Sequence, residues 1–185
     1  MEKIDLVYLW VDGSDPEWQQ QKQQALAASG REYSKQALAK GRFVQTDELK
    51  YSLRSVEKYA PWIDRVFILT ADQKSEWLNV EHPKVRLISH RDFIKGDYLP
   101  TFNSSAIEMC IADIEELGER FLLANDDMFF LKAVEPSFFY NREGLPIARM
   151  SPNKVKVSDL YSNKVLRAQQ LVAEKYGRLY ERMPH

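Results

Sequence analysis

The chain has 185 residues, of which 44% are hydrophobic, and it carries 26 Lys and Arg against 27 Asp and Glu, for a formal charge of -1. A chain of this length and apolar content fills one compact domain with a buried core. The near-neutral balance excludes the broad positive field that non-specific binding to nucleic acid or to an anionic membrane requires, so we expect no nucleic-acid partner.

Cysteine usage and the first residues of the chain predict a cytoplasmic location. The single cysteine, Cys110, excludes an internal disulfide and a zinc site built from several cysteines. No apolar run approaches the length of a bilayer span, and the charged N-terminus does not resemble a signal peptide. We therefore expect the chain to work in a reducing compartment on the cytoplasmic side.

Short apolar stretches that alternate with helical patterns predict an α/β fold. β-branched and other apolar residues run almost without interruption in four places, at residues 4–11, 65–70, 85–88 and 120–124. Such runs are typical of strands that are buried on both faces. Parallel strands need crossover connections, so the alternation predicts a mostly parallel sheet flanked by helices.

Three helical segments separate the predicted strands. Residues 17–42 are rich in Gln, Ala and Lys and are expected to form one or two surface helices. A second helix is expected to be capped by Thr46 or Asp47 and to stop at Pro61. A third is expected over residues 104–117, with isoleucines along one face. His82 and His90 lie between these elements and are expected in loops.

The charge distribution predicts an acidic body and a basic arm. Residues 1–150 carry 19 basic and 24 acidic side chains, whereas residues 151–185 carry 7 basic and 3 acidic ones. Residues 164–176 have apolar side chains at helical spacing, and residues 143–153, with two prolines and a glycine, are a plausible hinge. We expect an α/β body over 1–150 and a helical arm over 151–185.

In parallel sheets ligands bind beyond the carboxyl ends of the strands, which selects two loops of this chain. Asn125, Asp126 and Asp127 follow the last predicted strand. Two adjacent carboxylates repel each other unless a cation lies beside them, and Mg²⁺ or Mn²⁺ accepts one or two carboxylates together with substrate phosphates. The pair therefore predicts a metal site at Asp126 and Asp127, and the alternative is a solvated turn.

Asp12 and Asp15 follow the first predicted strand and flank Gly13 and Ser14. Their carboxylates can hold a sugar hydroxyl, orient a metal-bound water or act as the base on an acceptor hydroxyl. The alternative is a tight turn followed by a helix cap, which Asp and Ser favour for local reasons.

Further polar residues are candidates for binding phosphate. Asn103 and Ser104 open the third predicted helix, whose free N–H groups favour an anion. Glu108 stands three residues after Ser105, so a capping box is the alternative for it. Arg54 lies on the polar side of the second predicted helix and can clamp a phosphate through two nitrogens, although a surface arginine is the common case.

These segments resemble, in order along the chain, the first two conserved blocks of the Stealth family. The third block is matched in part by the C-terminal residues 182–185. The family includes bacterial capsular and cell-surface polysaccharide phosphotransferases and the catalytic subunit of the animal lysosomal-enzyme GlcNAc-1-phosphotransferase. The matching stretches are IDLVYLWVDGSDPEW at 4–18, DELKYSLRSVEKYAPW at 47–62, LPTFNSSAIE at 99–108, NDDMFF at 125–130 and RMPH at 182–185.

The resemblance implies a metal-dependent transfer of sugar-1-phosphate from a nucleotide-diphosphate sugar to a hydroxyl of an acceptor glycan, with release of a nucleoside monophosphate. It also implies a glycosyltransferase-like fold, a UDP-HexNAc donor, Mg²⁺ or Mn²⁺ as cofactor, and peripheral association with membrane-bound polysaccharide machinery. The implied catalytic residues are Asp12, Asp127 and His185, the metal ligands Asp126 and Asp127, and the substrate-binding residues Asp15, Arg54, Asn103, Ser104 and Glu108.

The family carries a fourth block beyond the histidine that His185 matches, and this chain stops short of it. The arm is therefore expected to be the start of a longer C-terminal region. Asp12 and His185 are both candidates for taking the acceptor proton. Two other functions fit the same residues: a metal-dependent glycosyltransferase of similar fold, and an incomplete module that binds a sugar nucleotide.

Overall fold

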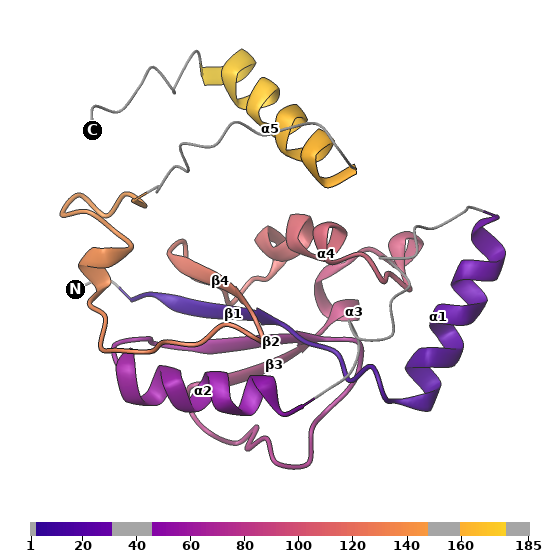
Figure 1. Ribbon diagram of the computed structural model, residues 1–185, viewed down its shortest axis with the longest axis horizontal. Helices are drawn as coiled ribbons and strands as arrows, with labels where there is room; N and C mark the ends of the chain where they lie inside the picture. The colour runs from indigo at the N-terminus through magenta and orange to yellow at the C-terminus, as the bar shows by residue number, and fades with distance from the viewer. Residues whose placement is uncertain (1–2, 31–45, 148–159, 177–185) are drawn as a thin grey trace. The chain divides into compact units, whose positions relative to one another are not determined.

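The computed structural model describes residues 3–30, 46–147 and 160–176 and divides the chain into two compact units, Met1–Phe138 and Phe139–His185. The first unit is built on a four-stranded sheet in the order β3-β2-β1-β4, in which every pairing is parallel. Helices lie on both faces of this sheet, as the prediction of an α/β fold requires (Figure 1). The strands are β1 (Asp5–Leu9), β2 (Val66–Thr70), β3 (Val85–Ser89) and β4 (Phe121–Asn125).

The strand boundaries follow from pairing and burial. The two central strands are the most deeply buried, and β2 is buried at every residue. β1 ends at Leu9, two residues before the apolar run does, and the Trp10 N–H still donates to the Leu69 carbonyl of β2 at 2.9 Å. β4 continues to Asn125, one residue further than predicted, because this residue pairs with Leu9.

One face of the sheet is covered by α2 (Glu48–Tyr59), which buries Leu49 and Val56 against Leu6, Tyr8 and Ile68. The helix begins and ends where the sequence predicts, but its cap differs. Asp47 occupies the cap position in the left-handed region, with φ 64°, and its side chain makes no capping hydrogen bond. The Glu48 carboxylate accepts the backbone N–H and the hydroxyl of Thr46 instead.

The other face is covered by α3 (His90–Phe93), α4 (Ser104–Cys110) and a 3-10 turn, η3 (Ile111–Asp113). The helix predicted over 104–117 is therefore too long. It ends at Cys110, and the tighter turn that follows keeps Ile111 and Ile114 buried in the core of this face. The unit also contains two short 3-10 turns, η2 (Gly96–Tyr98) and η4 (Pro136–Phe138).

His90 is not the loop residue that the sequence predicts. It opens α3, is only 5% exposed, and packs edge-on against Phe93 with ring centroids 6.1 Å apart. Burial lowers the pKa of His90, and the negative charge of Asp72 opposes this effect. His90 is therefore a neutral core residue near the carboxyl end of β3.

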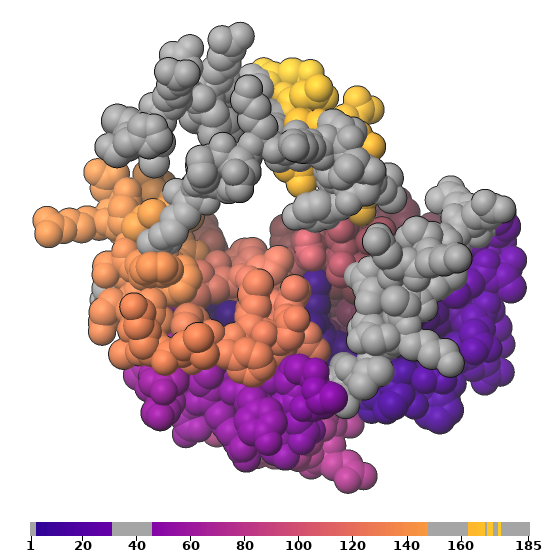
Figure 2. Space-filling view, in the orientation of Figure 1, coloured from indigo at the N-terminus to yellow at the C-terminus, as the bar shows by residue number. Residues whose placement is uncertain are grey.

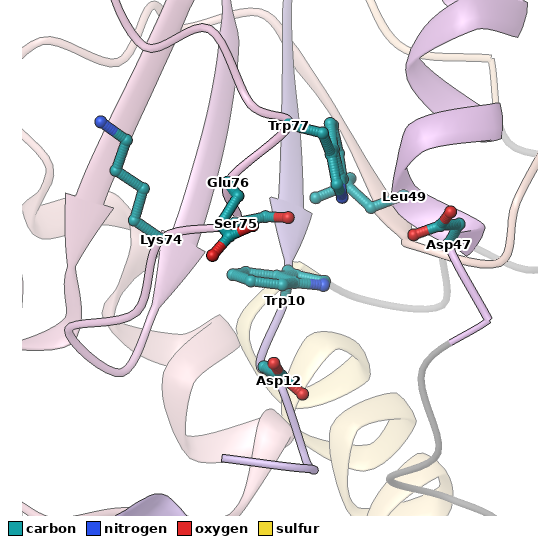
Figure 3. Close-up of a pocket in the computed structure, with 8 residues that line it drawn as sticks. All are labelled: Trp10, Asp12, Asp47, Leu49, Lys74, Ser75, Glu76 and Trp77. Carbon is teal, nitrogen blue, oxygen red and sulfur yellow. The ribbon is translucent and has the colours of Figure 1, made fainter.

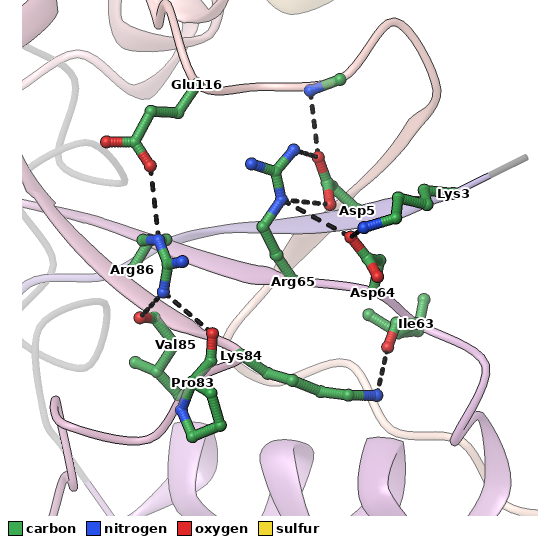
Figure 4. A network of polar contacts seen from close by, with 11 residues as sticks. Lys3, Asp5, Ile63, Asp64, Arg65, Pro83, Lys84, Val85, Arg86 and Glu116 are labelled. Atoms are coloured by element: carbon green, nitrogen blue, oxygen red, sulfur yellow. Dashed lines mark hydrogen bonds and ion pairs between the residues drawn. The ribbon is translucent and has the colours of Figure 1, made fainter.

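A buried ion pair holds the opposite edge of the sheet, where the strands begin (Figure 4). The Asp5 carboxylate accepts hydrogen bonds from Arg65 Nε at 3.1 Å and Nη2 at 2.8 Å, and from the Gly118 N–H at 3.0 Å. A Cβ at Gly118 would lie 3.1 Å from Asp5 Oδ2, so a larger residue would crowd the Asp5 carboxylate. This cluster ties β1, β2 and the segment before β4 together.

The second unit contains α5 (Leu160–Tyr176), which includes the helix predicted within residues 164–176. It also contains an antiparallel bridge between Tyr140 and Pro146 that closes a turn around Asn141. Among the described residues, no helix is both long enough and apolar enough to span a bilayer.

Candidate functional site

The parallel sheet brings the two predicted acidic loops to one edge. All four strands end at the same side, which we call the carboxyl edge, and β1 lies between β2 and β4. Because Leu9 pairs with Asn125, the chain leaves β1 toward Asp12 and leaves β4 toward Asp126 from neighbouring positions. The loop after β2, with Gln73, flanks β1 on the other side.

Gln73 holds the loop that follows β1, a role that was not predicted from the sequence. Its side-chain Nε2 donates to the Asp12 carbonyl at 2.9 Å and to Asp15 Oδ2 at 2.8 Å, while its Oε1 accepts the Asp12 N–H at 2.9 Å. Gln73 is 7% exposed, so these bonds are shielded from water. Its position at the end of a predicted strand was the only signal in the sequence.

Asp15 is the N-cap of α1 (Pro16–Ser29), which confirms the helix-cap interpretation of this residue. Its Oδ1 accepts the backbone N–H groups of Glu17 at 2.8 Å and Trp18 at 3.3 Å. The hydrogen bond from Gln73, followed by these backbone bonds, holds the pKa of Asp15 below its ordinary value. Both of its carboxylate oxygens are therefore engaged by the protein.

Asp12 is half-buried and forms a tight turn with Ser14. Its Oδ1 accepts the Ser14 N–H at 2.9 Å and the Ser14 hydroxyl at 2.6 Å. The turn interpretation of this residue is confirmed, and the same carboxylate lines an open cavity at the carboxyl edge. Asp12 is thus both fixed by its neighbours and accessible to a ligand.

Asp126 and Asp127 form a turn that is closed by a hydrogen bond from the Met128 N–H to the Asn125 carbonyl, at 3.1 Å. Asp127 is exposed and Asp126 is half-buried. Burial raises the pKa of Tyr8 to about 12, and the charge of Asp126 adds to that effect. The charge of Asp126 thus acts on the Tyr8 hydroxyl, a group in the core between β1 and α2.

Two serines of α2 anchor the segment after the acidic turn. Ser52 is fully buried and donates to the Met128 carbonyl while it bonds the Tyr8 hydroxyl at 2.6 Å. The Ser55 hydroxyl accepts the Phe130 N–H at 3.0 Å. Figure 2 shows this segment lying against the surface of α2. The bonds from Ser52 to Met128 and from Phe130 to Ser55 join residues 76 and 75 positions apart, and neither serine was predicted to have a role.

The acidic turn offers hard oxygen donors of the kind that Mg²⁺ and Mn²⁺ accept. In the parts of the chain that the structure describes, no group of three or more His, Cys, Asp or Glu side chains converges on one point. A cation at Asp126 and Asp127 would thus need further oxygens, and substrate phosphates are the usual source. The donor chemistry of the turn fits such a shared site.

The remaining predicted residues lie on other elements. Asn103 caps α4 by accepting the Ser105 N–H at 3.1 Å, so the capping box predicted for Ser105 and Glu108 is not formed. Glu108 is exposed, and Ser104 is the first residue of α4. Phe102, just before them, packs edge-on against Trp18 with ring centroids 5.4 Å apart, which places this segment beside the start of α1.

Arg54 and His185 are not brought to the carboxyl edge by any described contact. Arg54 is exposed on α2, and its guanidinium lies 5.4 Å from the centroid of the Tyr51 ring. His185 lies outside the described residues. The roles assigned to these two residues stay predictions.

An open cavity of about 400 Å³ lies at the carboxyl edge (Figure 3). It combines aromatic walls with carboxylates and is formed by the end of β1, the start of α2 and the loop after β2. Its lining residues are Trp10, Asp12, Asp47, Leu49, Lys74, Ser75, Glu76 and Trp77.

Two models of known protein families match the chain. The model of conserved region 1 of Stealth proteins matches residues 2–30, and that of conserved region 2 matches residues 42–148. The chain belongs to the Stealth family. The resemblance found in its sequence is thereby confirmed, and the two matched regions contain both acidic loops and the cavity.

Several curated relatives of the chain are named as polysaccharide phosphotransferases. The chain is 38% identical to an exopolysaccharide phosphotransferase of Streptomyces coelicolor over 98% of its own length and 31% of that protein. It is 41% identical to a capsular polysaccharide phosphotransferase of Neisseria meningitidis serogroup B, over 77% of the chain and 39% of the relative. A receptor polysaccharide phosphotransferase of Streptococcus oralis is 40% identical, over 79% of the chain and 44% of that protein. The chain thus spans less than half of the length of these relatives.

Proposed function

We propose that this Stealth chain binds a nucleotide-diphosphate sugar at its carboxyl edge and transfers sugar-1-phosphate to a hydroxyl of a glycan, in the synthesis of a capsular or other cell-surface polysaccharide. The observation that carries the proposal is the placement of the Asp12–Asp15 loop and the Asp126–Asp127 turn after neighbouring parallel strands. The names of the relatives support the class of reaction.

The bonding changes are those of a phosphoryl transfer. The acceptor oxygen bonds to the sugar-linked phosphorus, the bond from that phosphorus to the bridging oxygen breaks, and the nucleoside monophosphate leaves with the bridging oxygen. The acceptor proton passes to a base on the protein. Such reactions depend mainly on alignment and on neutralising the phosphate oxygens.

The acidic turn is the proposed site of Mg²⁺ or Mn²⁺, with Asp126 and Asp127 as the protein ligands. A bound divalent cation would neutralise negative charge on the diphosphate. The turn's own contribution is rigidity, because Ser52 and Ser55 fix the segment that follows it. Two carboxylates that are held in place bind an ion at a lower entropic cost than mobile ones.

Asp12 is the proposed base, and His185 is the second candidate for this role. Two observations support Asp12. Gln73 bonds both its backbone N–H and its carbonyl, and its side chain lines an open cavity. Asp15, Arg54, Asn103, Ser104 and Glu108 are proposed to bind substrate. The proposed donor is UDP-HexNAc, and the acceptor is a glycan presented at the cytoplasmic face by membrane-bound machinery.

Identification of the products tests the proposal. The full chain is incubated with UDP-GlcNAc or another nucleotide sugar, an acceptor glycan, and Mg²⁺ or Mn²⁺, and both products are analysed by mass spectrometry. We expect a nucleoside monophosphate and an acceptor that has gained sugar plus phosphate. A nucleoside diphosphate and a gain of sugar alone would instead establish a glycosyltransferase. Donor binding without turnover would contradict catalysis by this chain.

A further inference from the structure

The cavity at the carboxyl edge has a chemistry different from that of the acidic turn. It is formed by three segments that are far apart in the sequence, represented by Trp10 at the end of β1, Asp47 before α2 and Trp77 in the loop after β2. In Figure 3, the rings of Trp10 and Trp77 and the side chains of Ser75 and Glu76 gather around one space. Lys74, in the same loop, also lines this space.

The aromatic part of the wall is rigid. Trp10 is only 6% exposed and belongs to the core on the α2 side of the sheet. Trp77 is half-buried and packs against the same core, next to the buried Leu78, whose N–H donates to the Ser75 carbonyl at 3.1 Å. Indole rings that are held in place bind planar aromatic ligands at little entropic cost. This wall therefore favours a flat ring.

The polar part of the wall carries three carboxylates and the ammonium group of Lys74, so acidic groups predominate. Asp12, Asp47 and Glu76 contribute carboxylates, and Lys50 lies 3.4 Å from Asp47. Within the described residues, the side chain of Glu76 makes no hydrogen bond, and one oxygen of Asp12 is also left over after its bonds to Ser14. Carboxylates repel a diphosphate but accept N–H and O–H donors. The cavity thus favours a ligand group that is rich in such donors.

We infer that this cavity binds the nucleoside part of the donor, an assignment that rests on the proposed function and specifies where the donor lies. The base stacks on Trp77, and the Glu76 carboxylate accepts an N–H group of the base. The ribose hydroxyls lie toward Asp12, which belongs both to the cavity and to the acidic loop. The donor phosphates then extend out of the cavity, away from its carboxylates.

Calorimetric titration of the full chain with UMP, CMP, AMP and GMP in the absence of divalent cation tests this assignment. We expect one of the four to bind, because the nucleoside site needs no metal. Trp77→Leu is expected to weaken that binding by about 10-fold or more, since stacking on an aromatic ring is lost, whereas Trp77→Phe should retain most of it. Glu76→Gln should reduce the preference for one base over the others.

Trp62→Phe is the matched control, because Trp62 is a half-buried tryptophan that packs on the same core but does not line the cavity. Circular dichroism and thermal unfolding establish that each variant is folded. Unchanged nucleotide binding by a folded Trp77→Leu variant overturns the nucleoside site, as does a wild-type chain that binds none of the four nucleotides.

The proposal of a nucleoside site and the proposal of sugar-phosphate transfer can be refuted independently of each other. If Trp77→Leu keeps the wild-type KM for the donor while the chain still releases a monophosphate, only the nucleoside site is wrong. If Trp77→Leu loses nucleotide binding while the wild-type chain releases a diphosphate, the nucleoside site stands and sugar-phosphate transfer is wrong.

Discussion

Gln73 is the residue through which β2 holds the acidic loop that follows β1. Replacing it with leucine leaves the Asp12 N–H without its partner and removes one of the two donors to the Asp12 carbonyl, which keeps the Asp15 N–H at 3.3 Å. The expected cost is about 1–3 kcal/mol in the free energy of unfolding. We expect Gln73→Leu to lower kcat more than it raises the KM for the donor, because the proposed base is no longer held in place.

Urea unfolding and steady-state kinetics measure the two effects of Gln73→Leu. Gln23→Leu, an exposed glutamine of α1, is the control and should change neither. If Gln73→Leu loses stability but keeps the wild-type kcat, then Gln73 supports the fold alone and does not position Asp12.

His90 makes the stability of the fold depend on pH. Its pKa is lowered by burial, whereas in the unfolded chain it stays near the ordinary 6.5. Below pH 6.5 the unfolded chain takes up a proton on His90 more readily than the folded chain does. The stability that comes from burying the neutral His90 ring is therefore present above pH 6.5 and is lost as the pH falls. The free energy of unfolding should therefore decrease from pH 7.5 to pH 5.5, and His90→Gln should make that decrease smaller. An equal decrease in both proteins would contradict the assignment.

At the scale of elements, α2 connects the core to the acidic turn. Ser52 bonds Tyr8 of β1 and the Met128 carbonyl, so Ser52→Ala removes a buried partner from both. We expect a loss of about 1–3 kcal/mol in the free energy of unfolding. Turnover should fall as well, because the turn is no longer fixed. Thermal unfolding and product formation provide the measurements, and a variant with full stability would refute the role of Ser52.

The amino ends of β1 and β2 depend on one ion pair. The Asp5 side chain is 2% exposed and that of Arg65 is 26% exposed, and the bond to Asp5 raises the pKa of Arg65. Asp5→Ala leaves the Arg65 guanidinium without its main partner, so we expect the free energy of unfolding to fall by about 3 kcal/mol. This is the lower end of the range for a buried pair, because Arg65 is partly hydrated. Asp64→Ala removes the more exposed ion pair with Lys3 and should lower the free energy of unfolding by less than about 1 kcal/mol. Equal losses in denaturant titrations would contradict this ranking.

At the scale of the whole molecule, the sequence predicts the architecture because the signals are local. Apolar runs that alternate with helices lead to a parallel sheet, and the strand-end rule then selects the loops at Asp12 and Asp126. The supporting contacts are not local. Gln73 reaches Asp12 across 61 positions and Ser52 reaches Met128 across 76, and no spacing pattern encodes such pairs. The cavity is hidden for the same reason, since it joins three separate segments.

The central claim is that the two acidic loops form one site for a divalent cation and a donor diphosphate. Calorimetric titration with UDP-GlcNAc, with and without Mg²⁺, tests it most directly when wild type is compared with Asp127→Asn. Asp113→Asn, an exposed carboxylate on η3, is the control for loss of charge. We predict that Mg²⁺ tightens donor binding to the wild type and to Asp113→Asn by about 10-fold or more but has little effect on Asp127→Asn. An equal Mg²⁺ effect on all three proteins would contradict the claim.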